Sequence, residues 1–228
     1  MNKSEKKFET LSLKKWYEEQ YSKINVSAVP GSMTSKILHR LLEKPFKSNL
    51  DFSILEVGGN NGEHLEFVSP DFRDYILTDI RKTQIKHLPP RTKFIKADVQ
   101  KLPFTTETFD RTISTCLFHH INDPVKGFLE LRRVTKVGGT ISILIPNDPG
   151  MTYRFLRLIT SKRKAKASNL LVELNLIHAL EHRNHFLQLR TLLKHCFDED
   201  EIRVNSYPFL LPGFNLNALT TYHITKKF

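Results

Sequence analysis

The residues best suited to chemistry lie in the run Glu56-Val-Gly-Gly-Asn-Asn-Gly-Glu-His64. An apolar run, residues 52–57, leads into it and a helical pattern of apolar residues follows, which predicts a buried strand, a tight turn and a helix N-terminus. Glycines in the turn allow positive φ angles and let a ligand approach without meeting a Cβ, and exposed amides at a helix start favour an anionic group. Such a loop is typical of a binding site for a nucleotide-like cofactor.

The type of cofactor follows from the residues around these glycines. A phosphate-binding loop of the Walker type ends in Gly-Lys-Ser/Thr, whereas this loop ends in Gly62-Glu63-His64. Glu56 stands directly before the turn, where a carboxylate would repel the pyrophosphate of a dinucleotide but suits an amino group. S-adenosylmethionine offers an ammonium, a carboxylate and no phosphate, so it is the cofactor that this pattern favours.

The spacing Glu56-x-Gly58-x-Asn60-x-Gly62 resembles the first motif, E/D-x-G-x-G-x-G, of the class I S-adenosylmethionine-dependent methyltransferases. Asn60 replaces the middle glycine, and asparagine tolerates positive φ better than most residues do. The resemblance extends over about residues 50–146 and is loose on either side. It implies the following cofactor-binding residues: Glu56, Gly58, Gly59, Asn60, Gly62, Asp79, Ile80, Asp98, Val99, Thr115 and Cys116.

The resemblance also implies roles for some of these residues. Asp79 would accept hydrogen bonds from both ribose hydroxyls, and Asp98 would take the adenine amino group while the amide of Val99 meets the ring. Cys116 lies where the family places a small residue facing the cofactor, although a buried core thiol would occupy the same position. Glu56 or Asp79 alone would read as a solvated carboxylate at a strand end, so it is the ordered set that indicates the family.

The order of the predicted elements indicates an α/β fold. Strands are expected at about residues 52–57, 74–79, 92–97, 109–115 and 139–146, with a helix after each of the first four, which makes a parallel sheet. The resemblance implies a doubly wound, mostly parallel, seven-stranded Rossmann-like sheet with an antiparallel last strand, which a hairpin of residues 201–207 and 220–226 completes. One domain is expected, with an N-terminal helical cap (1–48), a cofactor-binding core (50–146), a helical substrate cover (147–198) and a C-terminal strand pair (199–228).

Two groups of residues are expected near the methyl group of the cofactor. His119 and His120 follow the fourth strand, and histidine is suited to act as a base because it titrates near neutral pH. The resemblance implies that one histidine here often anchors the loop instead, a role that we expect for His120 and that His119 could equally have. Trp16, Tyr17 and Tyr21 lie in a predicted helix that, in related methyltransferases, folds over the cofactor. They would cover the sulfonium or the substrate through cation–π attraction, or serve as ordinary packing residues.

A second concentration of polar side chains is Glu181-His-Arg-Asn-His185, between two apolar helical patterns. Here His182 or His185 would act as the base and Arg183 would bind an anionic group of the substrate. The alternative is a solvated face in which Asn184 caps the helix that starts at His185.

The charge balance indicates an acidic partner. With 35 basic and 24 acidic residues the formal net charge is +11, which suits nucleic acid, an anionic lipid surface or a phosphorylated small molecule. The densest basic run, residues 161–166, has no interleaved aromatic residues, so a nucleic-acid partner is less favoured. Cys116 and Cys196 lack the spacing of a zinc site or a disulfide framework, so no metal is expected.

The expected function is methyl transfer from S-adenosylmethionine to a small anionic acceptor, such as a sugar or a nucleotide-linked or lipid-linked metabolite, with O-methylation favoured. An RNA or protein methyltransferase and a non-catalytic methyltransferase-like partner subunit are the alternatives. A polar N-terminus and the lack of any apolar run of about 20 residues favour a cytoplasmic protein with no membrane span. The acceptor, the methylated atom and the oligomeric state stay open at this point.

Overall fold

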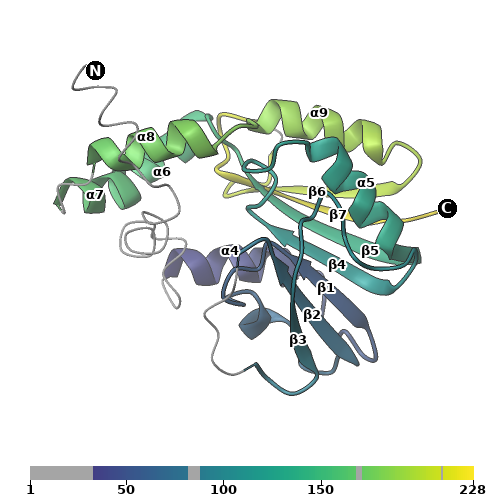
Figure 1. Ribbon diagram of the computed structural model, residues 1–228. Helices are drawn as coiled ribbons and strands as arrows, with labels where there is room; N and C mark the ends of the chain where they lie inside the picture. The colour runs from purple at the N-terminus through teal and green to yellow at the C-terminus, as the bar shows by residue number, and fades with distance from the viewer. Residues whose placement is uncertain (1–32, 82–87, 168–170, 212) are drawn as a thin grey trace, which may run out of the picture.

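The computed structural model describes residues 33–81, 88–167, 171–211 and 213–228 (Figure 1). A seven-stranded sheet has the order β3-β2-β1-β4-β5-β7-β6, in which β7 runs antiparallel to both of its neighbours and the first five strands run parallel. The strands are β1 (Ser53–Val57), β2 (Asp74–Asp79), β3 (Thr92–Lys96), β4 (Phe109–Thr115), β5 (Thr135–Pro146), β6 (Glu201–Tyr207) and β7 (Leu219–Thr225). The predicted fold class is confirmed. The aromatic residues expected in the N-terminal cap, Trp16, Tyr17 and Tyr21, lie outside the described residues.

The centre of the sheet creates the place where a ligand binds in folds of this type. All five residues of β1 are buried, and β1 pairs in parallel with β2 on one side and β4 on the other, so that Glu56 stands opposite Leu77 and Ile113. The strand order reverses between β1 and β4, which leaves a crevice outside the carboxyl ends of these strands at the switch point. The side chains at the ends of β1, β2 and β4 therefore meet at one edge of the sheet.

Helices cover the two faces of the sheet unequally (Figure 1). On one face lie α5 (Pro124–Val134) and α9 (Phe186–Cys196), which bury Phe128, Leu189 and Leu193 in one core cluster. The other face is covered by α4 (Met33–Glu43), whose apolar residues join a second cluster with residues of β1, β2 and β4.

A buried ion pair fixes α4 to the sheet. The Glu43 carboxylate accepts hydrogen bonds from Arg111 Nη1 at 2.8 Å and Nη2 at 2.7 Å, and it lies 2.9 Å from His64 Nε2. The guanidinium of Arg111 has no exposed surface, and the Phe46 ring lies over it with its centroid 3.4 Å away. His39 Nδ1 continues the network at 2.9 Å from His64 Nδ1. The helix thus carries its own counter-charge into the core.

The prediction of a helix after each of the first four strands is wrong for the first and third and is confirmed for the fourth by α5, whereas residues 82–87 after the second strand lie outside the described residues. Only a short 3-10 helix, η2 (Leu65–Phe67), follows β1, because the glycine turn uses much of the connection and Pro70 ends it. A turn that Asp98 and Lys101 close follows β3, with no helix among the described residues before β4. With these connections short, α4 supplies the cover that the predicted helices would have given.

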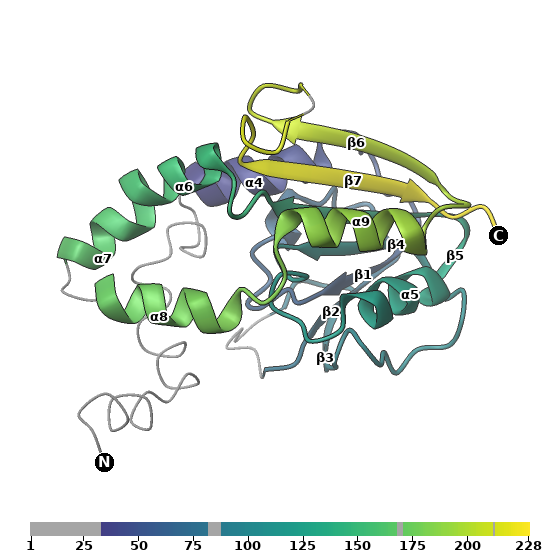
Figure 2. The same ribbon diagram turned by 90° about the horizontal axis from the view of Figure 1, so that it is seen from above.

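The segment between β5 and β6 divides into two parts. Its first helices are α6 (Met151–Arg157), the π-helical η3 (Leu158–Lys162), α7 (Arg163–Ala167) and α8 (Leu171–Glu181). They project beyond the carboxyl ends of the parallel strands, whereas α9 returns to lie beside α5 on the sheet (Figure 2). The helical cover expected for residues 147–198 is therefore limited to the part before α9. Among the described helices, none is long and apolar enough to cross a membrane.

Candidate functional site

The glycine turn after β1 has the backbone conformation that its sequence demands. Gly58, Asn60 and Gly62 have φ angles of 66°, 48° and 77°, in the left-handed region that glycine adopts freely and asparagine tolerates. Gly59 is needed for space, because a Cβ there would lie 2.0 Å from a methyl carbon of Leu77. The amide of Gly59 donates to the carbonyl of Thr78 at 3.0 Å, which holds the turn against the end of β2.

Glu56 lies beneath this turn with about 1% of its surface exposed. Its carboxylate accepts a hydrogen bond from the Tyr75 hydroxyl at 2.7 Å. Burial raises the pKa of Glu56 to about 7, with the nearby His64 and the Tyr75 hydrogen bond opposing that change. Among the described residues the Tyr75 hydroxyl is the one hydrogen-bond partner of this carboxylate, so an approaching cation would stabilise it and the position suits an ammonium group.

Acidic residues at the ends of β2 and β3 border the turn. Asp79 accepts hydrogen bonds from the amide of Asn60 at 3.1 Å and from the amide of Arg81 at 2.8 Å. Ile80, the next residue, presents an apolar side chain that is 61% exposed, which suits the face of a flat ring. Asp98 accepts from the amide of Gln100 at 2.9 Å, so it closes its own turn while remaining half-buried.

The end of β4 completes the same edge of the sheet. Thr115 is its last residue, and Cys116 follows with a φ of 51°. Burial raises the pKa of the Cys116 thiol to about 12, so the thiol stays neutral. Leu117 packs against the turn, where a Cβ added to Gly58 would lie 2.7 Å from it. Val99, by contrast, is buried in the core cluster. The predicted cofactor-binding residues therefore surround the carboxyl ends of four neighbouring strands.

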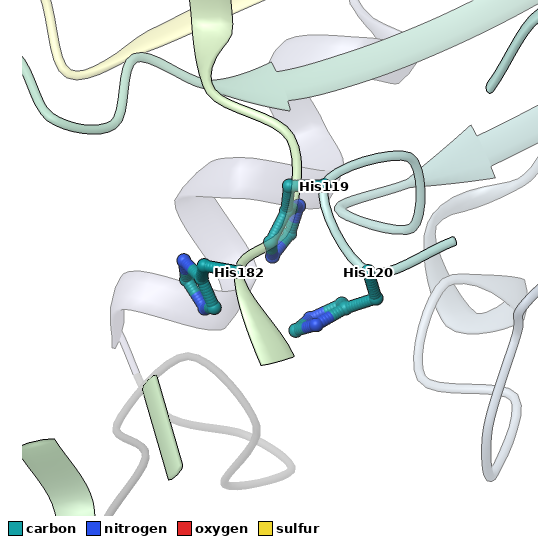
Figure 3. A group of neighbouring side chains, drawn as sticks. All are labelled: His119, His120 and His182. Atoms are coloured by element: carbon teal, nitrogen blue, oxygen red, sulfur yellow. The ribbon is translucent and has the colours of Figure 1, made fainter. Parts of the chain in front are cut away.

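Three histidines from two distant segments lie together beside this edge (Figure 3). The ring of His119 lies with its centroid 3.9 Å from that of His120 and 4.5 Å from that of His182, and the last two are 5.0 Å apart. His119 and His120 follow β4, whereas His182 follows the last residue of α8. We call the three neighbouring imidazoles of His119, His120 and His182 the histidine cluster.

Asn184 holds these two segments together. Its side-chain amide donates to the carbonyl of Phe118 at 3.0 Å and to that of Ile121 at 2.7 Å. The backbone amides of Arg183 and Asn184 both donate to the carbonyl of His119, at 2.9 and 3.2 Å. The alternative that Asn184 caps the following helix is wrong, because the N-cap of α9 is His185. Asn184 instead fixes the loop after β4 to the end of α8.

The imidazoles of the cluster are held in their neutral form. Burial lowers the pKa of His119 well below its usual value and lowers that of His120 to about 3. Burial also lowers the pKa of His182, where a hydrogen bond to Asp148 opposes the change. His182 Nδ1 lies 2.8 Å from Asp148 Oδ2, and His178 Nε2 lies 3.2 Å from the same oxygen. A neutral imidazole oriented by a carboxylate is an arrangement suited to general-base chemistry.

Two residues predicted to face the substrate lie apart from the cluster. His185 is exposed, and its Nδ1 accepts a hydrogen bond from the amide of Gln188 at 3.3 Å. The exposed Arg183 donates to the side chain of Asn122. Asp148 and His178 were not selected from the sequence, although His178 is four residues before His182, the spacing that places two side chains on one helix face.

A basic pocket opens next to Asp148. It encloses about 200 Å³, and it is lined by Asp148, Pro149, Arg154, Arg157, Leu158, Lys162 and His178. Three of these residues carry a positive charge, and Asp148 belongs to both the pocket and the contacts of His182. An anionic group bound between η3 and α8 would therefore lie close to the histidine cluster.

In comparisons with known proteins, the matching family model and the first relative named here are both methyltransferases. Residues 55–143 match the model of a methyltransferase domain. The chain is 27% identical over 127 residues to 2-methyl-6-phytyl-1,4-hydroquinone methyltransferase 1 of Oryza sativa subsp. japonica, covering 53% of this chain and 38% of that protein. An uncharacterised protein of Methanocaldococcus jannaschii is 30% identical over 111 residues, covering 49% of this chain and 48% of the relative. The chain thus spans less than half the length of these relatives.

Solved structures agree on the fold. A chain from the complex of the Haloferax volcanii Trm112 methyltransferase activator matches with a TM-score of 0.65 at 12% identity, covering 95% of this chain and 98% of that one. Phosphoethanolamine N-methyltransferase 2 of Haemonchus contortus, solved with S-adenosyl-L-methionine, matches with a TM-score of 0.60 at 14% identity, covering 96% of this chain and 60% of that one. At these identities the likeness concerns the fold alone.

Proposed function

We propose that this chain, a member of the class I S-adenosylmethionine-dependent methyltransferases, methylates a hydroxyl of a small anionic acceptor, with S-adenosylmethionine as its cofactor. The single observation that carries the proposal is the histidine cluster, which lies beside the predicted cofactor residues at the end of β4. When bound, the cofactor supplies a methyl group made electrophilic by the sulfonium.

The chain's own residues would bind the cofactor by complementary charge and hydrogen bonding. We assign the ammonium to the buried Glu56, whose raised pKa falls when a cation approaches. Asp79 would exchange its hydrogen bond from the Asn60 amide for the ribose hydroxyls, and Asp98 would accept from the adenine amino group. Ile80, exposed beside Asp79, would pack on the adenine ring.

The histidine cluster would remove the proton from the acceptor hydroxyl. Because Asp148 accepts from Nδ1 of His182, the other ring nitrogen, Nε2, is left with its lone pair to accept the acceptor's proton. The carboxylate of Asp148 then stabilises the imidazolium that forms. An in-line displacement at a methyl group needs no covalent enzyme intermediate. The rest of the rate acceleration would therefore come from positioning the reactants and excluding water.

The acceptor is expected to carry a phosphate or carboxylate. Arg154, Arg157 and Lys162 line the pocket beside Asp148, and guanidinium groups bind such anions through paired hydrogen bonds. Phe155 and Leu158, exposed by 63% and 58% on the same helices, add apolar surface next to these charges. This combination favours an acceptor with an anionic group and an apolar part, as in a lipid-linked metabolite.

Transfer of label from methyl-tritiated S-adenosylmethionine into cell extracts tests the function. We expect label in the small-molecule or lipid fraction, bound in an alkali-stable ether. Label confined to the RNA or the protein fraction would overturn the choice of acceptor. An Arg154→Gln/Arg157→Gln variant should raise the KM for the labelled fraction while leaving the affinity for S-adenosylmethionine unchanged, because these side chains line only the acceptor pocket.

A further inference from the structure

We infer that His119, His120 and His182 together bind one divalent transition-metal ion, with their imidazoles as three ligands and an open position toward the acceptor. The chemical class is set by the ligands, because neutral imidazole suits zinc, iron, nickel and copper rather than magnesium or calcium. The inference extends the proposed function by assigning the histidine cluster a ligand role that the sequence did not predict.

The three imidazoles already converge. One ring nitrogen from each residue lies within 4.8 Å of one ring nitrogen of the other two, and the rings face a shared space between the loop after β4 and the end of α8 (Figure 3). Imidazole nitrogens bound to a tetrahedral zinc ion at about 2.0–2.1 Å are roughly 3.3 Å apart. Small side-chain rotations therefore suffice to close the site.

The hydrogen bonds made by the Nδ1 atoms of His120 and His182 resemble those that orient metal-binding histidines. His120 Nδ1 lies 3.1 Å from the carbonyl of Glu181, and His182 Nδ1 lies 2.8 Å from the carboxylate of Asp148. A carbonyl and a carboxylate only accept hydrogen bonds, so both Nδ1 atoms carry a proton and both Nε2 atoms keep their lone pairs. Metal-ligating histidines are oriented in this way by a carbonyl or carboxylate on the far ring nitrogen.

His119 supplies an independent observation. Its side chain is buried, and its Nδ1 atom has no hydrogen-bond partner among the described residues. An unpartnered buried polar atom costs roughly 1–3 kcal/mol, so such an atom in a native structure calls for a partner. A metal ion held by the other ring nitrogen, Nε2, would fix the orientation of this ring in the shared space.

Three protein ligands leave a coordination position free, as in catalytic rather than structural zinc sites. An acceptor hydroxyl in that position would lose its proton to solvent more readily, because a bound cation stabilises the alkoxide. The oxygen then supplies the electron pair of the new carbon–oxygen bond, and the pair of the broken carbon–sulfur bond stays on sulfur. With the ion present, His182 is a ligand and not the base, while Asp148 keeps the same contact.

The test uses the tag-free full chain, stripped with a chelator and titrated with Zn²⁺ by calorimetry and with Co²⁺ by visible absorption. We expect one equivalent of each, and X-ray absorption at the zinc edge should show three nitrogen scatterers at about 2.0–2.1 Å. His120→Asn and His182→Asn should weaken binding by at least about tenfold, and Asp148→Asn by about 10–100-fold through loss of its support. The matched control is His185→Asn, which removes an exposed imidazole outside the cluster and should bind as the wild type does.

Binding of less than about a tenth of an equivalent, or equal binding by His120→Asn and the wild type, would overturn the metal site. The X-ray absorption spectrum of the wild type decides the question if the variants fail to fold. Calorimetry with S-adenosylmethionine on the stripped protein separates the two claims. Retained cofactor binding and label transfer without any metal would sink the metal inference alone, whereas loss of cofactor binding under every metal condition would sink the proposed function.

Discussion

Two groups of buried histidines in this chain have opposite surroundings. His39 and His64 lie under α4, where Glu43 and Arg111 complete a network with a full counter-charge. In the histidine cluster after β4 the imidazoles face one another, and the Nδ1 atom of His119 has no partner among the described residues.

The carboxylates of the two groups sharpen this contrast. Burial alone would raise the pKa of Glu43, but hydrogen bonds from His64 and Arg111 outweigh it and lower that pKa to about 2. Asp148 likewise has a lowered pKa, but through His178 and His182 rather than through an arginine. A buried carboxylate bound by arginine is already satisfied, whereas the contact of Asp148 with Nδ1 of His182 leaves Nε2 of that ring available to a ligand. The first group is therefore structural and the second is the candidate for chemistry.

Substitution of His182 should have the largest effect of all on turnover. We expect His182→Asn to lower label transfer by about 10²–10⁴, the range that a positioned proton-transfer group contributes. Its free energy of unfolding should change by about 1 kcal/mol or less, because the side chain lies at the edge of the core. A loss of transfer below threefold, measured with saturating S-adenosylmethionine, would remove the cluster from the reaction.

Substitution of Arg111 should act on stability instead. Arg111→Met leaves Glu43 buried without its cation, and breaking a buried ion pair from one side costs about 3–5 kcal/mol. Chemical denaturation followed by circular dichroism measures this loss. The double variant Glu43→Gln/Arg111→Met should recover part of it, since no charge then remains unpaired. Equal stability of Arg111→Met and the wild type would contradict the structural role of this group.

Glu56 is buried like Glu43, but its pKa is shifted in the opposite direction. The pH dependence of protein stability therefore distinguishes the two carboxyl groups. The pKa of Glu56 in the folded protein, about 7, exceeds the usual 4.5. The contribution of Glu56 to the free energy of unfolding is therefore fully present below about pH 4.5 and is lost as pH rises through 7. The wild type should lose on the order of 3 kcal/mol of unfolding free energy relative to Glu56→Gln between pH 4.5 and 8. Parallel pH profiles for the two proteins would show that Glu56 is ionised without cost.

Asp79→Ala should give the smallest of these effects. Loss of one charge-assisted hydrogen-bonding group weakens binding by about 1.5–3 kcal/mol, or roughly ten- to a hundredfold in the dissociation constant for S-adenosylmethionine. Calorimetry measures it directly. Asp74→Ala is the matched control, because Asp74 begins the same strand at its opposite end. An affinity unchanged by Asp79→Ala would mean that another residue holds the ribose.

The sequence predicted the sheet closely because its signals are local. Apolar runs ending in Glu56 and Asp79 set the strands of the centre to within a residue or two, and the final hairpin was placed equally well. The predicted helix after β1 failed because the glycine turn and Pro70 left too little chain for it. The spacing of apolar residues predicts a helix, but it does not show whether the connection is long enough to contain one.

The cluster was only partly predictable, for a different reason. His119 and His120 were selected as a pair and His182 was selected separately. Their proximity depends on the ends of β4 and α8 meeting, which Asn184 secures across more than 60 positions of sequence. Asp148 ends up beside His182 for the same tertiary reason. His185, equally plausible in sequence, is instead an exposed helix cap. The residue types suggested the chemistry, but the packing of distant segments determines which histidines lie close enough to act together.

A crystal structure of the full chain with S-adenosylhomocysteine, the demethylated product of the cofactor, would show whether the histidine cluster faces the reacting group. We expect the amino group of the ligand at Glu56 and its sulfur facing the space shared by His119, His120 and His182. A sulfur directed away from this space, or toward the network of Glu43 and His64, would contradict the assignment of the histidine cluster to the acceptor side.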